Sequence, residues 1–102
     1  MLFIIDHRHS AENCPAGVCK PNWDFAVKMN DSAKACGVQV IEGFVDLRGH
    51  RMYFAVDATY EQQVYDFAKP LMGVGRLQVV PVIRWSAIVE SVKRSKVREG
   101  SP

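Results

Sequence analysis

The sequence lacks the features that mark membrane-spanning proteins and nucleic-acid-binding proteins. None of its apolar runs approaches the ~20 consecutive residues that a membrane-spanning helix needs. Its 13 basic and 11 acidic residues leave a formal charge of only +2, and the basic residues do not alternate with aromatic residues that could stack on bases. We therefore expect neither a membrane nor a nucleic acid as a partner.

Cysteine is scarce as well, and its spacing excludes the common metal and redox motifs. The first two of the three cysteines, Cys14 and Cys19, are too far apart for the C-x-x-C of a zinc knuckle or a thioredoxin site. The stretch before Asp6 has no basic residue, and its apolar run is too short for a secretory signal. We therefore expect a cytoplasmic protein whose thiols stay reduced. Cys36 is then a core residue, while Cys14 and Cys19 are inert thiols, a redox pair or ligands of a metal shared with a histidine.

Internal repeats and low-complexity segments are also absent from the sequence. Its composition is that of one small globular domain. Of the 102 residues, 48% are hydrophobic and 24% are charged. A chain of this length forms a single domain with a modest core. We expect that core within residues 1–85, followed by a short helix and a basic tail over residues 86–102.

The rest of the chain is arranged around a β-hairpin over residues 38–57. Two runs rich in β-branched and aromatic residues flank a turn that contains Gly49, which is typical of a hairpin. One strand, residues 2–9, and one helix, residues 22–36, precede it. A second helix and a fourth strand follow it.

The second helix begins with a capping box in which Thr59 is the N-cap and Gln62 is the third helical residue. Apolar residues follow at helical spacing, and Pro70 ends or kinks the helix. The fourth strand covers residues 76–85. Because Pro81 cannot donate a ladder hydrogen bond, it places this strand at an edge of the sheet.

This order of elements, βαββαβ, predicts an α+β fold of the ferredoxin-like kind. Right-handed crossovers then give a four-stranded antiparallel sheet with strand order 4-1-3-2 and both helices on one face. The apolar residues that we expect in the core are Phe3, Ile5, Val27, Phe54, Val56, Val64, Phe67, Leu71 and Val79.

The other face of the predicted sheet is too apolar to remain in water. It carries Phe44, Tyr53, Val80 and Val82 together with Glu42, Gln78 and Arg84. Monomers rarely expose a contiguous apolar patch of more than a few hundred Å². A second copy of the chain is the simplest cover, so we expect a homodimer.

Over residues 1–85 the chain resembles the dimeric α/β barrels, a superfamily that includes muconolactone isomerase and the antibiotic-biosynthesis monooxygenases. The resemblance rests on the order of the elements, on the Gly49-His50 pair in the hairpin and on the Val-Val-Pro-Val sequence of Val79–Val82. It is closer to small members of that group. The resemblance implies two ferredoxin-like subunits whose sheets form one barrel, and an activity on a small organic substrate.

All three histidines are expected at one end of the sheet. His7 and His9 lie at the end of the first strand, and His50 lies in the hairpin turn. A His-X-His pair in a strand directs both imidazoles to one face. Together with His50 they would suit a zinc, copper or iron ion that keeps an open coordination position. The alternative is that polar residues simply gather where strands end.

Arginines are expected near the same end. Arg48, Arg51 and Arg76 would hold the carboxylate or phosphate of a ligand, and the start of the first helix would add its free amides. The alternative is that all three guanidinium groups are only solvated.

Acid–base chemistry is a further hypothesis for the non-helix face of the sheet. Glu42 and Tyr53 fall there, where a buried carboxyl group is suited to general acid–base catalysis, with His7 as the alternative base. The competing interpretation is a hydrogen-bonded pair in the dimer interface.

The resulting hypothesis is a homodimer that binds a small molecule in an apolar pocket, as an isomerase or monooxygenase that works without a cofactor or with a divalent transition metal. The alternative is a non-catalytic module whose histidine-lined site binds a metal or a metabolite.

Overall fold

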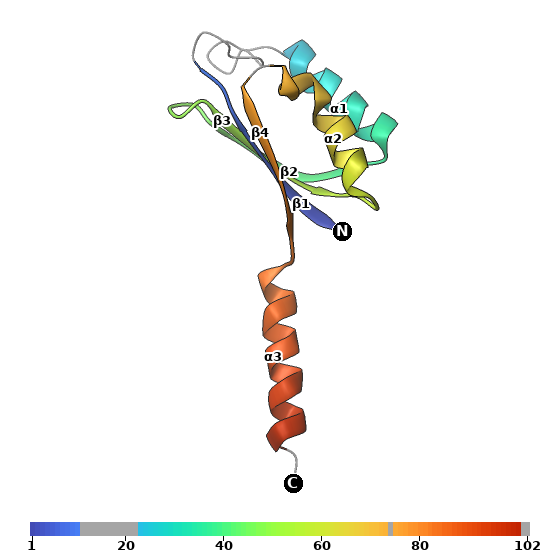
Figure 1. Ribbon diagram of the computed structural model, residues 1–102, viewed down its shortest axis with the longest axis vertical. Coiled ribbons are helices and arrows are strands. Elements are labelled where there is room, and N and C mark those ends of the chain that lie inside the picture. Colours follow the sequence, from blue (N-terminus) through green and yellow to red (C-terminus); the bar gives the residue numbers. More distant parts are fainter. Residues whose placement is uncertain (11–22, 74, 101–102) are drawn as a thin grey trace.

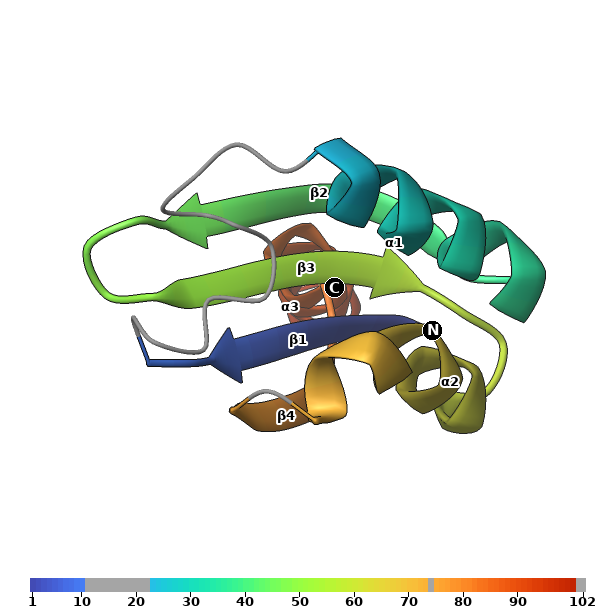
Figure 2. The same cartoon turned by 90° about the horizontal axis from the view of Figure 1, so that it is seen from above.

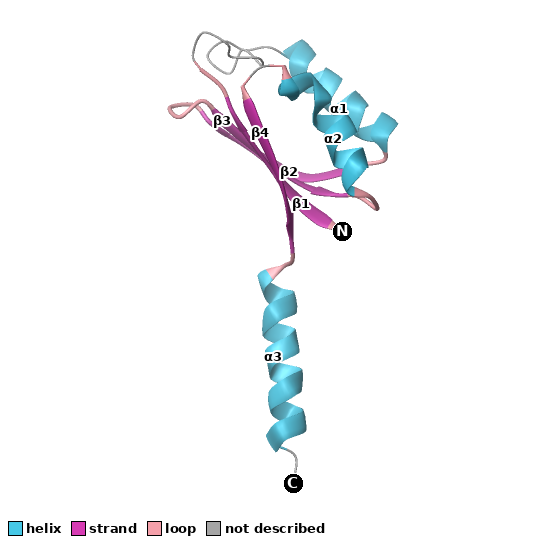
Figure 3. Ribbon diagram, in the orientation of Figure 1, coloured by secondary structure: helices cyan, strands magenta, loops and turns pink. Residues whose placement is uncertain are grey.

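The computed structural model describes residues 1–10, 23–73 and 75–100, and it has the α+β architecture that the sequence predicts (Figures 1 and 3). Four strands form one antiparallel sheet, and three helices accompany it. In chain order the elements are β1 (Leu2–Arg8), α1 (Trp23–Cys36), β2 (Gln39–Asp46), β3 (Arg51–Asp57), α2 (Glu61–Met72), β4 (Arg76–Val82) and α3 (Trp85–Gly100).

The strands lie in the order β2-β3-β1-β4, so β4 is an edge strand, as Pro81 predicts. In the register of the sheet, Ile5 of β1 lies between Phe54 of β3 and Val79 of β4. Figure 2 shows α1 and α2 side by side over one face of this sheet. We call that side the covered face, and we call the opposite side, which carries Ile4 and Phe44, the open face.

The core lies between the covered face and the two helices. Alternate residues of β1 point into it because side chains alternate along a strand. The buried apolar residues are Phe3, Ile5, Met29, Ala33, Val38, Met52, Val56, Ala58, Val64, Phe67, Ala68 and Leu71, with Phe54 and Val79 packed against them and partly buried. Eight of the nine predicted core residues therefore lie in the core or against it.

The prediction for Val27 is wrong, because its side chain is 57% exposed. In an α-helix each residue turns by about 100°, so Val27 lies on the far side of the helix axis from Met29. Met29 and Ala33, four residues apart, form the buried stripe of α1, and Cys36 continues it at the edge of the core.

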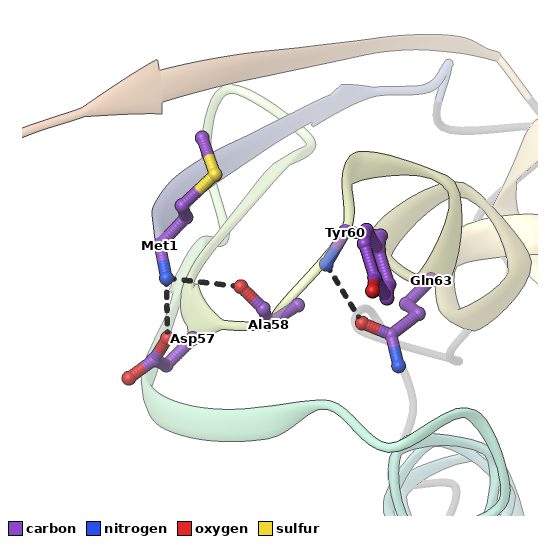
Figure 4. A network of polar contacts seen from close by, with 5 residues as sticks. All are labelled: Met1, Asp57, Ala58, Tyr60 and Gln63. Atoms are coloured by element: carbon purple, nitrogen blue, oxygen red, sulfur yellow. Dashed lines mark hydrogen bonds and ion pairs between the residues drawn. The ribbon is translucent and has the colours of Figure 1, made fainter.

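The predicted capping box is shifted by one residue. The N-cap of α2 is Tyr60 instead of Thr59, and the backbone N–H of Tyr60 donates to Oε1 of Gln63 at 2.9 Å (Figure 4). Two consecutive glutamines, Gln62 and Gln63, made either register possible from sequence alone. The helix also continues past Pro70 and ends at Met72.

The first strand is tied to the end of β3 by the chain's own amino group. The N-terminal ammonium of Met1 lies 3.0 Å from Oδ1 of Asp57 and 3.0 Å from the carbonyl oxygen of Ala58 (Figure 4). This contact is at the end of the sheet opposite to the β2–β3 turn, since Leu2 pairs with Asp57 in the register.

The C-terminal segment differs most from expectation. In place of a short helix and a basic tail there is one helix, α3, of 16 residues. It extends away from the sheet in Figure 1, so that the molecule measures 63 × 30 × 20 Å. No glycine or proline interrupts residues 85–99, and this absence lets the helix continue through the basic residues. Among the described residues, no helix has both the length and the apolar character that crossing a membrane requires.

Candidate functional site

The candidate histidines and arginines gather at one end of the sheet, and the candidate residues as a whole are divided between its two faces. There β1 ends at Arg8, the β2–β3 turn ends at His50, and β4 begins at Arg76. Gly75 allows the start of β4 to lie close to β1, because a Cβ at this position would collide with the carbonyl oxygen of Arg8. Its left-handed φ of 102° is also one that residues with a side chain rarely adopt.

The three histidines lie together on the covered side. The ring centroids of His7 and His9 are 5.3 Å apart and stacked, and those of His9 and His50 are 5.5 Å apart and edge to face. The backbone N–H of His9 also donates to the carbonyl oxygen of His50 at 3.0 Å. His7 and His9 are buried, and His50 closes the turn with a left-handed φ of 52°. The structure thus brings together the residues of the predicted histidine cluster.

The two buried histidines have different surroundings. Nε2 of His7 donates to the carbonyl oxygen of Leu71 at 3.1 Å, which ties β1 to the last turn of α2. In this tautomer Nδ1 is the basic nitrogen of the ring. Within residues 1–10, 23–73 and 75–100, neither ring nitrogen of His9 has a hydrogen-bond partner. Burial, followed by the charges that His7 and His50 can carry, lowers the pKa of His9, so its neutral form is favoured.

The use of these histidines as metal ligands stays a prediction. In the part of the chain that the structure describes, no group of three or more histidine, cysteine, aspartate or glutamate side chains is placed to hold a metal ion. Cys14 and Cys19, the other ligands considered, lie outside the described residues.

Glu42 and Tyr53 lie on the open face, on neighbouring strands. In the register Glu42 is opposite Ala55, and Tyr53 is opposite Phe44. Oε1 of Glu42 accepts the N–H of the adjacent Gly43 at 3.0 Å, and the side chain is exposed. The sheet separates both residues from His7, so the structure does not join His7 to them in one acid–base site.

The predicted arginines are also only partly brought together. Arg51 and Arg76 lie on the open face, on the strands that flank β1. Arg48 is in the β2–β3 turn, where its N–H donates to Oδ1 of Asp46 at 3.1 Å. The residue between Arg51 and Arg76 in the register is Arg8, which sequence analysis missed. The alternation of β1 was the available signal, because inward-facing His7 makes Arg8 face outward.

Among the hollows that border the open face within the described residues, two lie at opposite ends of β4. One of about 510 Å³ lies where α3 joins the sheet and is lined by Met1, Leu2, Pro81, Val82, Ile83, Arg84 and Ala87. The second, of about 370 Å³, lies at the arginine end and is lined by Asp6, Arg8, Arg76, Leu77 and Gln78. The first is almost wholly apolar in its lining, while the second combines charged, amide and apolar side chains.

Comparison with other proteins adds no assignment to this geometry. No known family model matches the chain, and no curated protein matches it.

Proposed function

We propose that the chain is a ferredoxin-like subunit of a dimeric α/β barrel, in which two open faces enclose a pocket for a small organic molecule. The order of the elements and the strand order support this assignment. The observation that carries it is the apolar open face. Phe44 is 61% exposed there and Val80 is 37% exposed, and Ile4, between their strands and partly buried, continues the apolar surface.

The position of α3 supports the same proposal. Isolated helices of about this length are marginal in water, so a stable α3 needs a surface to pack on. Figure 1 shows that it stands clear of the sheet and of the other two helices. Trp85, Ile88 and Val92, at helical spacing, give it an exposed apolar stripe. The stripe begins directly after β4, so one partner could cover both the open face and α3.

Enclosure would give the open-face residues a chemical role. Glu42 and Tyr53 would lie within the barrel, where a carboxylate and a phenol can exchange a proton with a bound substrate. That arrangement supports an isomerase or a monooxygenase. Exclusion of water by the second sheet would strengthen every polar contact with the substrate.

The dimer is tested by sedimentation velocity of the wild-type chain at micromolar concentration, with variants on the two sides of the molecule. Phe44→Glu places a charge on the open face and should convert the dimer to monomer, because an unpaired buried charge is costly. Val27→Glu is the matched control, since it adds the same charge to an exposed apolar position on α1, and it should leave the dimer intact. A wild-type chain that sediments as a monomer would refute the proposal.

A second candidate function is metal binding by the histidine cluster. The observation in its favour is the contact between Nε2 of His7 and the carbonyl oxygen of Leu71. Metal-binding imidazoles commonly donate their other N–H to such a carbonyl, which orients the ring. The neutral state favoured for His9 also suits a ligand.

Metal content measured after supplementation with zinc, copper or iron tests this candidate. Bound metal should be lost from His7→Ala, His9→Ala and His50→Ala alike, and so should any rise in melting temperature on adding the metal. Stoichiometric metal in all three variants, or none in the wild type, would remove the metal hypothesis.

A further inference from the structure

A row of three arginines crosses the open face at the end where β1 stops. We propose that Arg8, Arg51 and Arg76 form an anion site that takes the carboxylate or phosphate group of a small-molecule ligand. The position of this site inside a closed pocket rests on the proposed dimer, but the row itself belongs to a single chain.

The register of the sheet establishes the row. Arg8 of β1 is directly opposite Arg51 of β3 and also directly opposite Arg76 of β4. Residues directly opposite each other in antiparallel strands have side chains on the same face. Neighbouring strands are about 4.8 Å apart, so the outer two Cα atoms of the row are separated by about 10 Å. Long arginine side chains can converge on one anion across that distance.

Within the described residues, no arginine of the row forms an ion pair. The ion pair found there joins Met1 to Asp57, at the other end of the sheet. Asp46 lies opposite Arg51 in the register, but its Oδ1 accepts the N–H groups of Arg48 and Gly49 at 3.1 and 2.9 Å. Like charges that face each other across strands repel, so an added anion would stabilise this arrangement.

The hollow beside the row gives the anion a place to bind. Arg8 and Arg76 line its space of about 370 Å³, together with Gln78, Leu77 and Asp6. Guanidinium groups present paired N–H donors that match the oxygens of carboxylate and phosphate, and a glutamine amide adds further donors.

Asp6 limits what the site accepts. Its carboxylate shares the hollow with the arginines, and in the register it lies opposite Tyr53 and Gln78, one step along the open face from the row. A second negative group reaching toward this step would meet its charge. The ligand is therefore one with a single anionic group at one end and an uncharged body.

Titration with inorganic phosphate and with benzoate, followed by amide chemical shifts, tests the site. Replacing an arginine of the row by Arg8→Gln, Arg51→Gln or Arg76→Gln removes a charge-assisted hydrogen bond, and each should weaken binding by about tenfold. Arg48→Gln is the matched control, with the same change of charge in the neighbouring turn, and should change the affinity by about twofold or less. Asp6→Asn should tighten binding, because it removes the repelling charge.

The outcomes separate this site from the dimer. Sedimentation of the same samples reports the oligomeric state. A monomer that binds the probes through the row would refute the proposed dimer and support the anion site. A dimer in which neither probe binds at millimolar concentration would overturn the site alone. The site is also overturned if Arg48→Gln weakens binding as much as Arg8→Gln, since only general charge attraction would remain. It is equally overturned if the row variants dissociate the dimer, because the row would then contact a second copy.

Discussion

The two faces of the sheet are built from the same strands but have different surroundings. On the covered face Phe3, Ile5 and Val56 are at most 1% exposed beneath α1 and α2. On the open face apolar side chains of the same strands remain accessible, and Phe44 is 61% exposed. Two helices suffice to cover one side of a four-stranded sheet, and α3 extends away from the other. The difference shows that the chain by itself buries the apolar residues of one sheet face and leaves those of the other face exposed.

The largest expected effect tests the covered face. Phe67 is fully buried, and its ring meets that of Phe54 edge to face with centroids 6.1 Å apart. Phe67→Ala should lower the free energy of unfolding by roughly 3–5 kcal/mol, because it leaves a cavity that the core cannot close. Urea denaturation measures this change.

The open-face counterpart of that variant is Phe44→Ala. In samples dilute enough to be monomeric, it should alter the free energy of unfolding by about 0.5 kcal/mol or less, as at other exposed positions. Equal losses from Phe67→Ala and Phe44→Ala under those conditions would show that the two faces do not differ as described.

A smaller effect tests the close approach of β4 to β1 at the end of the sheet that carries the arginine row and the histidine cluster. Gly75→Ala places a Cβ against the carbonyl of Arg8 at a left-handed φ, and it should destabilise the fold by about 1–3 kcal/mol. Because Arg8 and His9 would shift together, the variant should also disturb the amide signals of both the arginine row and the histidine cluster.

Gly73→Ala is the control for this change. Among the described residues, no atom would lie within 4 Å of a Cβ at Gly73, and its φ of −79° is one that alanine adopts freely. The melting temperature should therefore stay the same or rise slightly, since alanine restricts the unfolded chain. A loss as large as that of Gly75→Ala would show that the effect at Gly75 does not come from its contact with Arg8.

The smallest expected effect is a pH dependence of stability that arises from His9 on the covered side. The pKa of His9 is lowered by burial and by the neighbouring His7 and His50, so the unfolded chain takes up a proton before the folded one. The contribution of His9 to the free energy of unfolding is therefore fully present above the unfolded pKa of about 6.5. It is lost progressively as the pH falls below that value. Melting temperatures between pH 7.5 and 5.5 should fall more steeply for the wild type than for His9→Gln. Parallel curves would show that His9 does not titrate differently in the folded state.

Much of the fold could be predicted because local pattern and topology agree. The hairpin, the edge position of Pro81 and the buried stripe of α2 that contains Phe67 were all readable from periodicity and turn residues. The clustering of the three histidines also followed from strand direction. Val27 was misplaced because α1 has several apolar residues on different sides, so its pattern alone did not single out the buried stripe.

The sequence by itself determined which residues alternate, where turns fall and which class of fold results, since these depend on neighbours in the chain. Only the tertiary structure decided that α3 extends away from the sheet and leaves the open face uncovered. Only it placed Arg8 between Arg51 and Arg76, and the sheet between His7 and Tyr53. These are relations between residues far apart in the chain, and they are set by how strands pair and helices pack, which no local pattern records.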